Sequence, residues 1–212
     1  NVSNNIELIN GKIVSNGNTK GKNLTVEHGK ITGIGKFDFL NIINSGFISP
    51  GEGINGSGQL TLISNTVLTE KSTVILDINT TNTTDKLIVV GSLDLNGSLH
   101  INSTSDLLKY PGNSAINLIS ASEYDGIFTN LTFLNNHYGL LRKKLNYKTN
   151  GDINLQFLNP IYENLTINTS SEKIAKHIDT FSSETSSNFQ DVLNSINYLK
   201  SNQVADTLQD LI

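Results

Sequence analysis

Three aspartates, Asp77, Asp85 and Asp94, are the clearest candidate catalytic set in this sequence. They are near neighbours in a region rich in strand-forming residues, so they could lie on neighbouring strands. Paired carboxylates serve as general acid and base or nucleophile in glycoside hydrolysis. Isolated acidic residues on the outer face of a strand more often maintain solubility and oppose edge pairing. Because no carboxylate groove is recognisable in the sequence, a polysaccharide-active enzyme is a minor hypothesis.

The glycine-rich stretch 51–56 matches the G-x-G-x-x-G pattern of dinucleotide-binding loops. Such a loop needs a buried strand before it and a helix after it, so that the phosphate meets the helix N-terminus. Pro50 precedes the stretch and a strand-like run follows it. We therefore interpret 51–56 as a loop or turn.

The histidines and basic residues do not form a recognisable site. The sequence has four histidines, which are His28, His100, His137 and His177. Their spacing does not match that of histidines that bind a metal ion together. We expect His100 on the outer face of a strand and His177 packed beside a helical stripe. The one basic cluster, Arg142 to Lys144 with Lys148, is interpreted as a solvated turn. The sequence thus predicts no catalytic, cofactor-binding or metal-binding residues, no cofactor and no enzymatic activity.

Composition narrows the class of protein. The 212 residues carry a formal net charge of −4, so no basic face for nucleic acid is expected. The chain has no Cys, which excludes disulfides, thiolate metal sites and a cysteine nucleophile. It also has no Met, even at position 1, which indicates an internal fragment or a processed piece. No apolar run reaches the length of a membrane helix, and no signal peptide is recognisable.

The elements that would position any site are short strands, most clearly in three consecutive hexads at 87–92, 93–98 and 99–104. Apolar residues alternate with others in each hexad, which is the strand period. Gly91 and Gly97 mark breaks between them. Short strands in one register bury a face by stacking, as in a β-solenoid. A left-handed hexapeptide helix is equally compatible with the hexads alone, but three hexads are too few for that fold.

The rest of residues 1–160 is also predicted to form short strands, which are separated by turns that contain Gly and Asn. Gly11, Gly29 and Gly46 recur about every eighteen residues, which is about one turn of a three-sided coil. The Asn-rich composition suits stacked turns and amide ladders, although a compositional bias of the genome explains it equally well. The expected strands are 6–9, 12–14, 24–26, 30–32, 37–39, 47–48, 60–62, 74–78, 115–119, 127–128, 131–133 and 153–157.

The pattern becomes helical after Pro160. Residues 169–172 and 187–190 have the form of capping boxes, which satisfy free backbone N–H groups at a helix start. Apolar residues then recur at helical spacing, so we expect two or three amphipathic helices in 169–212. Their stripes must be buried on each other, on a partner or on the end of the β region.

Several of these segments together resemble the pertactin-like passengers of bacterial autotransporters. Residues 45–53 (Ser-Gly-Phe-Ile-Ser-Pro-Gly-Glu-Gly) resemble a glycine-proline turn of that family, and residues 71–78 resemble the strand after it. Residues 85–101 resemble the following hexad block, and 110–121 with 126–128 resemble its close. Ser114 and Ala115 stand where the family usually has an aromatic residue. The segment after Pro160 is similar to the linker that precedes the outer-membrane barrel.

The resemblance implies a mostly β chain, a right-handed parallel β-helix with a C-terminal cap and then short α-helices. The implied divisions are β-helix rungs at 1–104, a C-terminal β cap or autochaperone-like region at 105–160, and an α-helical linker at 161–212. This region would fold early outside the cell and template the growth of the β-helix toward its N-terminus. The implied location is the bacterial cell surface or outer membrane, or the medium after cleavage.

The family's pattern carries no catalytic residues, so the first hypothesis is a non-enzymatic stem within a virulence or adhesion protein. Its partner would be the chain's own C-terminal outer-membrane β-barrel, which lies outside residues 1–212. The alternative is an adhesin or self-association module that binds host-cell surface molecules or a neighbouring copy. In that case the stripe from Phe189 to Leu199 would be a contact surface.

Overall fold

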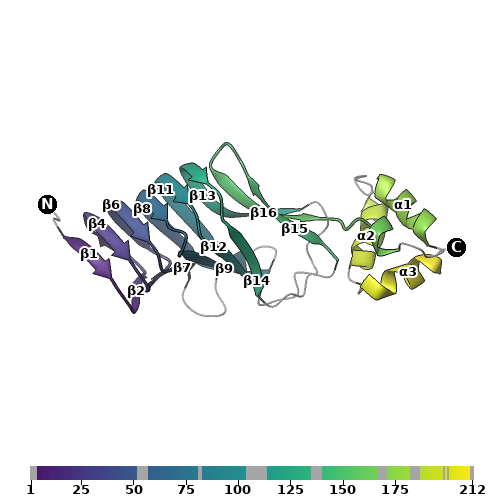
Figure 1. Cartoon of the computed structure of the whole chain (residues 1–212), viewed down its shortest axis with the longest axis horizontal. Helices are drawn as coiled ribbons and strands as arrows, with labels where there is room; N and C mark the ends of the chain where they lie inside the picture. Colours follow the sequence, from purple (N-terminus) through teal and green to yellow (C-terminus); the bar gives the residue numbers. More distant parts are fainter. Residues whose placement is uncertain are drawn as a thin grey trace. The chain divides into compact units, whose positions relative to one another are not determined.

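The computed structural model describes residues 4–51, 57–80, 83–103, 114–134, 140–166, 171–181, 187–197, 199 and 201–210. The protein is mostly β, with parallel sheets and three short helices at its C-terminal end (Figure 1). It divides into two compact units. One contains 1–105, 117–136 and 146–154, and the other contains 106–116, 137–145 and 155–212.

Two sheets contain the strands. The first has the order β1 (Asn5–Leu8), β4 (Asn23–Val26), β6 (Lys36–Asn44), β8 (Gln59–Leu68), β11 (Lys86–Leu95), β13 (Ala115–Gly126), β16 (Asp152–Leu158) and β15 (Arg142–Tyr147), with β3 (Asn18–Lys20) also pairing with β6. The second has the order β14 (Asn130–Leu134), β12 (Ser98–Ser103), β9 (Thr73–Thr80), β7 (Phe47–Pro50), β5 (Lys30–Gly33) and β2 (Lys12–Ser15), with β10 (Thr83–Thr84) on β9.

From β4 to β9 the chain alternates between the two sheets, and each strand pairs in parallel with the next strand of its own sheet. Hydrogen-bonded neighbours are 18 residues apart between β1 and β4 and 31 residues apart between β11 and β13. The spacing expected from Gly11, Gly29 and Gly46 is therefore confirmed for the early turns. Backbone bonds join these positions directly, because Lys30 N donates to Gly11 O and Phe47 N to Gly29 O.

The hexads are arranged differently from the sequence prediction. Residues 87–95, from the first two hexads, lie in one strand, β11, and residues 98–103 lie in β12 of the other sheet. They therefore pair with strands of the preceding and following turns, not with each other. Gly97 lies in the turn between β11 and β12, as expected, but Gly91 lies within β11. There the register with β13 shifts by one residue, which marks a bulge.

The core of the β unit consists of the inward side chains of both sheets. The apolar positions that fall in register between the hexads are at most 3% exposed, and they are Leu87, Val89, Leu93, Leu95, Leu99 and Ile101. Equivalent positions on the other turns, such as Leu24, Ile42 and Leu62, are also buried. The period-two pattern thus predicted the buried face correctly, because strand side chains alternate strictly between the two faces.

Four segments differ from the sequence prediction, and the first is the two-residue strand β10, which is not among the expected strands. Residues 127–128 form a connection between β13 and β14, not a strand. Strand β3 was not predicted, because only Thr19 of its three residues suggests a strand. The basic cluster was predicted as a solvated turn, but Arg142 to Lys144 lie in β15 and only Lys148 follows that strand. Residues 52–56 of the glycine-rich stretch and residues 169–170 of the first capping box lie outside the described residues.

The helical unit contains the short 3-10 helix η2 (Glu163–Leu165) and helices α1 (Glu172–Phe181), α2 (Ser187–Asn197) and α3 (Ser201–Gln209). Three helices therefore fill the region in which two or three were expected. Their apolar stripes pack on each other in one core, together with Tyr162. The buried members of this core are Tyr162, Ala175, Ile178, Leu193, Ile196, Val204 and Leu208.

Candidate functional site

The outer face of the first sheet carries a groove in two adjoining parts. One part encloses about 560 Å³ over strands β1, β4 and β6, and the other about 310 Å³ over β8, β11 and β13. Strands β6 and β8 are paired neighbours, so the two parts follow each other along the sheet (Figure 1). We call this surface the sheet groove. Two parallel rows of outward side chains line it.

The first row is polar on every strand. It consists of Asn5, Asn23, Asn41, Asn65, Ser92 and Glu123, one from each of the six strands. Asn23 Nδ2 donates to Asn5 Oδ1 and Asn41 Nδ2 donates to Asn23 Oδ1, both at 2.9 Å. Ser92 Oγ donates to Asn65 Oδ1 at 3.1 Å. The amide ladder expected from the Asn-rich composition is therefore present in this row.

The second row runs beside the first and changes character along its length. Its members, paired in register across the six strands, are Glu7, Thr25, Ile43, Val67, Asp94 and Asp125. Ile43 and Val67 form an apolar centre and are 44% and 36% exposed. Asp94 and Asp125 form an acidic end together with Glu123 of the first row. Among the described residues, no Lys, Arg or His lines either part of the groove.

The structure does not gather the three predicted aspartates. Asp94 lies in the sheet groove, whereas Asp77 lies on β9 of the second sheet and Asp85 precedes β11. Asp94 instead has Asp125 as its neighbour in register. The sequence shows no recognisable carboxylate groove, whereas the structure places Asp94, Glu123 and Asp125 together in the sheet groove. Sequence reasoning missed it because Asp125 and Glu123 are far from Asp94 in the chain.

Asp85 is a buried carboxylate that joins three segments of backbone. Its Oδ1 accepts the N–H of Gly58 at 2.7 Å, and its Oδ2 accepts the N–H of Asp77 at 3.0 Å. The residue is 1% exposed. Burial raises the pKa of Asp85 to about 6, and the two backbone N–H donors oppose part of that rise. This carboxylate organises backbone and is not accessible to a substrate.

The other candidates occupy separate positions. His100 faces outward on β12, as predicted, whereas His177 is exposed and stacks edge-to-face on Phe181 with ring centroids 4.8 Å apart. His177 therefore does not pack beside the core stripe as predicted, and His137 lies outside the described residues. Burial lowers the pKa of Lys143 to about 8. Within the described ranges, no group of three or more His, Asp or Glu residues is arranged to hold a metal ion.

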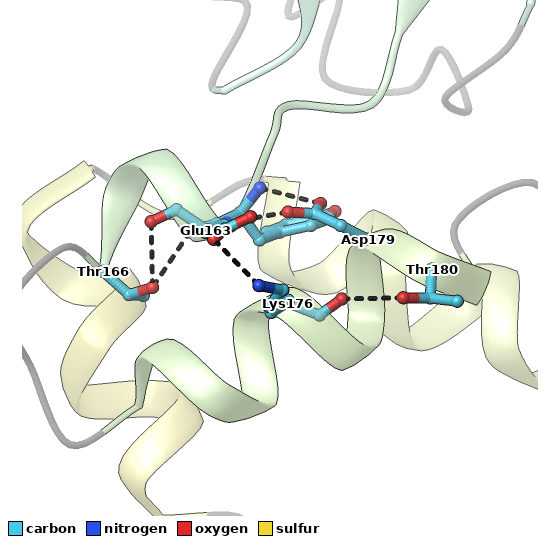
Figure 2. Close-up of polar contacts among 6 residues, drawn as sticks. Glu163, Thr166, Lys176, Asp179 and Thr180 are labelled. Carbon is cyan, nitrogen blue, oxygen red and sulfur yellow. Dashed lines mark hydrogen bonds and ion pairs between the residues drawn. The ribbon is translucent and has the colours of Figure 1, made fainter.

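The helical unit contains a polar contact that fastens η2 to α1 (Figure 2). The carboxylate of Asp179 accepts the backbone N–H groups of Tyr162 and Glu163 at 2.9 and 2.8 Å. Glu163 also lies 3.8 Å from Lys176 Nζ. Because a carboxylate at a helix start satisfies free N–H donors, this contact is a cap supplied from another helix.

A buried polar chain passes through the same helical unit. The Tyr162 hydroxyl donates to Asn197 Oδ1 at 2.7 Å, and Asn197 Nδ2 donates to Asn159 Oδ1 at 3.1 Å. Burial raises the pKa of Tyr162, and the nearby charge of Asp179 raises it further. These residues satisfy each other inside the unit, which indicates a structural role.

No protein-family model matches the chain, and no curated protein is similar to it in sequence. Of the helices in the described part of the chain, none combines the length and the apolar character that a membrane crossing requires.

Proposed function

We propose that this chain is a right-handed parallel β-helix and that it is the stem, or autochaperone region, of a surface-exposed autotransporter passenger. In this proposal it is not an enzyme, and it belongs to a virulence or adhesion protein. Its role is to fold first outside the cell and to support export of the passenger across the outer membrane. Its partner is the passenger's own C-terminal outer-membrane barrel. It is located at the cell surface, or in the medium after cleavage.

The observation that carries the proposal is the continuous parallel pairing of β1, β4, β6, β8, β11 and β13. No single turn of this chain has a core of its own, since each strand buries its apolar face only with its neighbours. Such an array grows by adding turns to an existing end. The middle strand β11 is paired along both of its edges, which makes it a suitable nucleus.

The first strand also favours growth toward the N-terminus. Its inward residues Ile6 and Leu8 are only half-buried, whereas Leu24 and Val26 on the next strand are fully buried. A further turn stacked on β1 would cover Ile6 and Leu8 and would continue the amide ladder from Asn5. No described strand pairs with the outer edge of β1, and this edge has the apolar and hydrogen-bonding groups that a templating end requires.

Stability of the proposed nucleus can be tested by placing a charge inside it. Leu93→Asp and Leu95→Asp each bury an unpaired carboxylate, so we expect each to lower the free energy of unfolding by about 3 kcal/mol or more. Asp94→Asn, between them on the outer face, is the matched control and should leave the unfolding midpoint unchanged. An unchanged midpoint in both leucine variants would show that β11 is not the core.

The export role is tested by display at the cell surface. Residues 1–212 would be placed between an export signal with an N-terminal epitope tag and an outer-membrane barrel in a Gram-negative host. We expect the tag to reach the surface, and Leu93→Asp to reduce surface labelling severalfold at equal expression. Asp94→Asn should display normally. Equal labelling of all three chains would contradict a role in export even if Leu93→Asp is unstable in solution.

A further inference from the structure

From the two rows that line the sheet groove, we propose that it binds an uncharged, extended polysaccharide chain. The inference goes beyond the proposed stem function and does not depend on it. It assigns a binding site, without catalysis, to the outer face of β1, β4, β6, β8, β11 and β13.

The dimensions of the groove suit a polymer that runs across the strands. Six paired strands about 4.8 Å apart give a surface about 24 Å long. Each strand contributes one residue to each row, so the polar side chains of the first row recur at the strand spacing. A sugar unit of a straight β-linked chain advances by a similar distance. An extended peptide advances by only about 3.4 Å per residue, so it does not keep this register.

The first row has the hydrogen-bonding capacity that hydroxyl groups require. An amide offers two N–H donors and an oxygen acceptor, and the ladder between Asn5, Asn23 and Asn41 uses only part of this capacity. Each of these side chains can therefore still donate to and accept from a ligand. Sugar hydroxyls are both donors and acceptors, so they match amides, whereas aliphatic ligands do not.

The second row supplies the apolar centre and most of the acidic end of the groove, and both match parts of a sugar chain. Ile43 and Val67 are neighbours in register and are exposed in the middle of an otherwise polar groove. The C–H face of a sugar ring would cover them and remove apolar area from water. The carboxylates Asp94, Glu123 and Asp125 can accept from hydroxyls at one end. These carboxylates, together with Glu7 at the other end, repel anionic polysaccharides.

The proposal is tested by titrating purified 1–212 with hexasaccharides in a calorimeter. We expect saturable binding of cellohexaose, a straight neutral β-linked chain. Maltohexaose, which has the same composition but a curved chain, and the anionic hexagalacturonate should bind at least about tenfold more weakly. Asn65→Ala and Asp94→Ala should each weaken cellohexaose binding about fivefold to tenfold, as expected for the loss of one hydrogen bond. His100→Ala, on the outer face of β12, is the matched control and should bind normally.

Several outcomes would overturn the inference. One is the absence of saturable cellohexaose binding, and another is equal affinity for maltohexaose or hexagalacturonate. Binding of hexalysine in place of cellohexaose would show that the surface is only an acidic patch. Equal loss in His100→Ala would place the binding outside the groove. Thermal unfolding of each variant separates a lost contact from a lost fold.

Discussion

Asp85 illustrates how a single carboxylate can connect the turns of this fold. It is buried, and its two oxygens accept backbone N–H groups from Gly58 and Asp77. An apolar residue there would leave both donors unsatisfied. Burying the charge is nevertheless unfavourable, and this cost raises the pKa of Asp85 to about 6.

The raised pKa predicts a pH dependence of stability. The folded protein holds the Asp85 proton up to about pH 6, whereas the unfolded chain releases it near pH 3.8. The folded state therefore binds more protons in this window, and the Asp85 contribution to stability falls as pH rises from about 4 to about 6, by at most about 3 kcal/mol. Urea unfolding at several pH values, compared between the natural chain and Asp85→Asn, measures this change.

Asp85→Asn cannot titrate, so the stability difference between the natural chain and this variant should shrink as pH rises through that window. Other titrating groups affect both chains equally and cancel in the difference. Asp94→Asn, on the exposed face of β11, serves as the control substitution. A difference between the natural chain and Asp85→Asn that is constant from pH 4 to pH 7 would contradict the raised pKa.

The bulge at Gly91 gives the clearest prediction for a single strand, β11. Gly91 has a φ of 142°, a conformation that residues with a side chain rarely adopt, and a Cβ there would overlap the carbonyl oxygen of Ser64. Gly91→Ala should therefore destabilise the β unit by about 2 kcal/mol or more, measured by urea unfolding. Gly17→Ala, where a Cβ meets nothing within 4 Å, should have little effect. Equal urea midpoints for Gly91→Ala and Gly17→Ala would show that the bulge tolerates a side chain.

The cap between η2 and α1 gives a prediction for the helical unit. Asp179→Ala removes the acceptor for the N–H groups of Tyr162 and Glu163, so those two amides should exchange with solvent about tenfold faster or more. Hydrogen exchange followed by NMR measures this directly. Asp206→Ala, an exposed acid on α3, is the control and should leave both rates unchanged. Unchanged rates in Asp179→Ala would exclude the cap.

The sequence allows the buried faces to be predicted, but not the sheet groove. Alternation in 87–104 identifies Leu93 and Ile101 as inward because a strand's faces follow from its own residues. The groove depends on which residues become neighbours across strands that are up to 31 residues apart. Asp94 meets Asp125, and Ile43 meets Val67, only through that register. The hexads were also predicted to pair with each other, because a local period does not show which turn a strand joins.

At the scale of the molecule, the core of the helical unit changes the expectation for self-association. The stripe from Phe189 to Leu199 was considered as a surface for a partner. Leu193 and Ile196 are instead at most 3% exposed, and Phe189 and Leu199 pack against the same core. The helices therefore already cover each other, which is one of the three arrangements that the sequence allowed.

This burial predicts the oligomeric states of the full and the shortened chain. A self-association module would make residues 1–212 dimeric and a chain ending at 165 monomeric. We expect the full chain to be monomeric and the shortened chain to self-associate. Tyr162, Leu140 and Leu165 pack on the helical core, so their apolar surface would be uncovered in the shortened chain. Sedimentation velocity over a range of concentrations distinguishes the two cases. Val192→Glu, at a position already 48% exposed on α2, should leave the full chain monomeric. A full chain that is dimeric, and becomes monomeric in Val192→Glu, would instead identify α2 as a contact between copies.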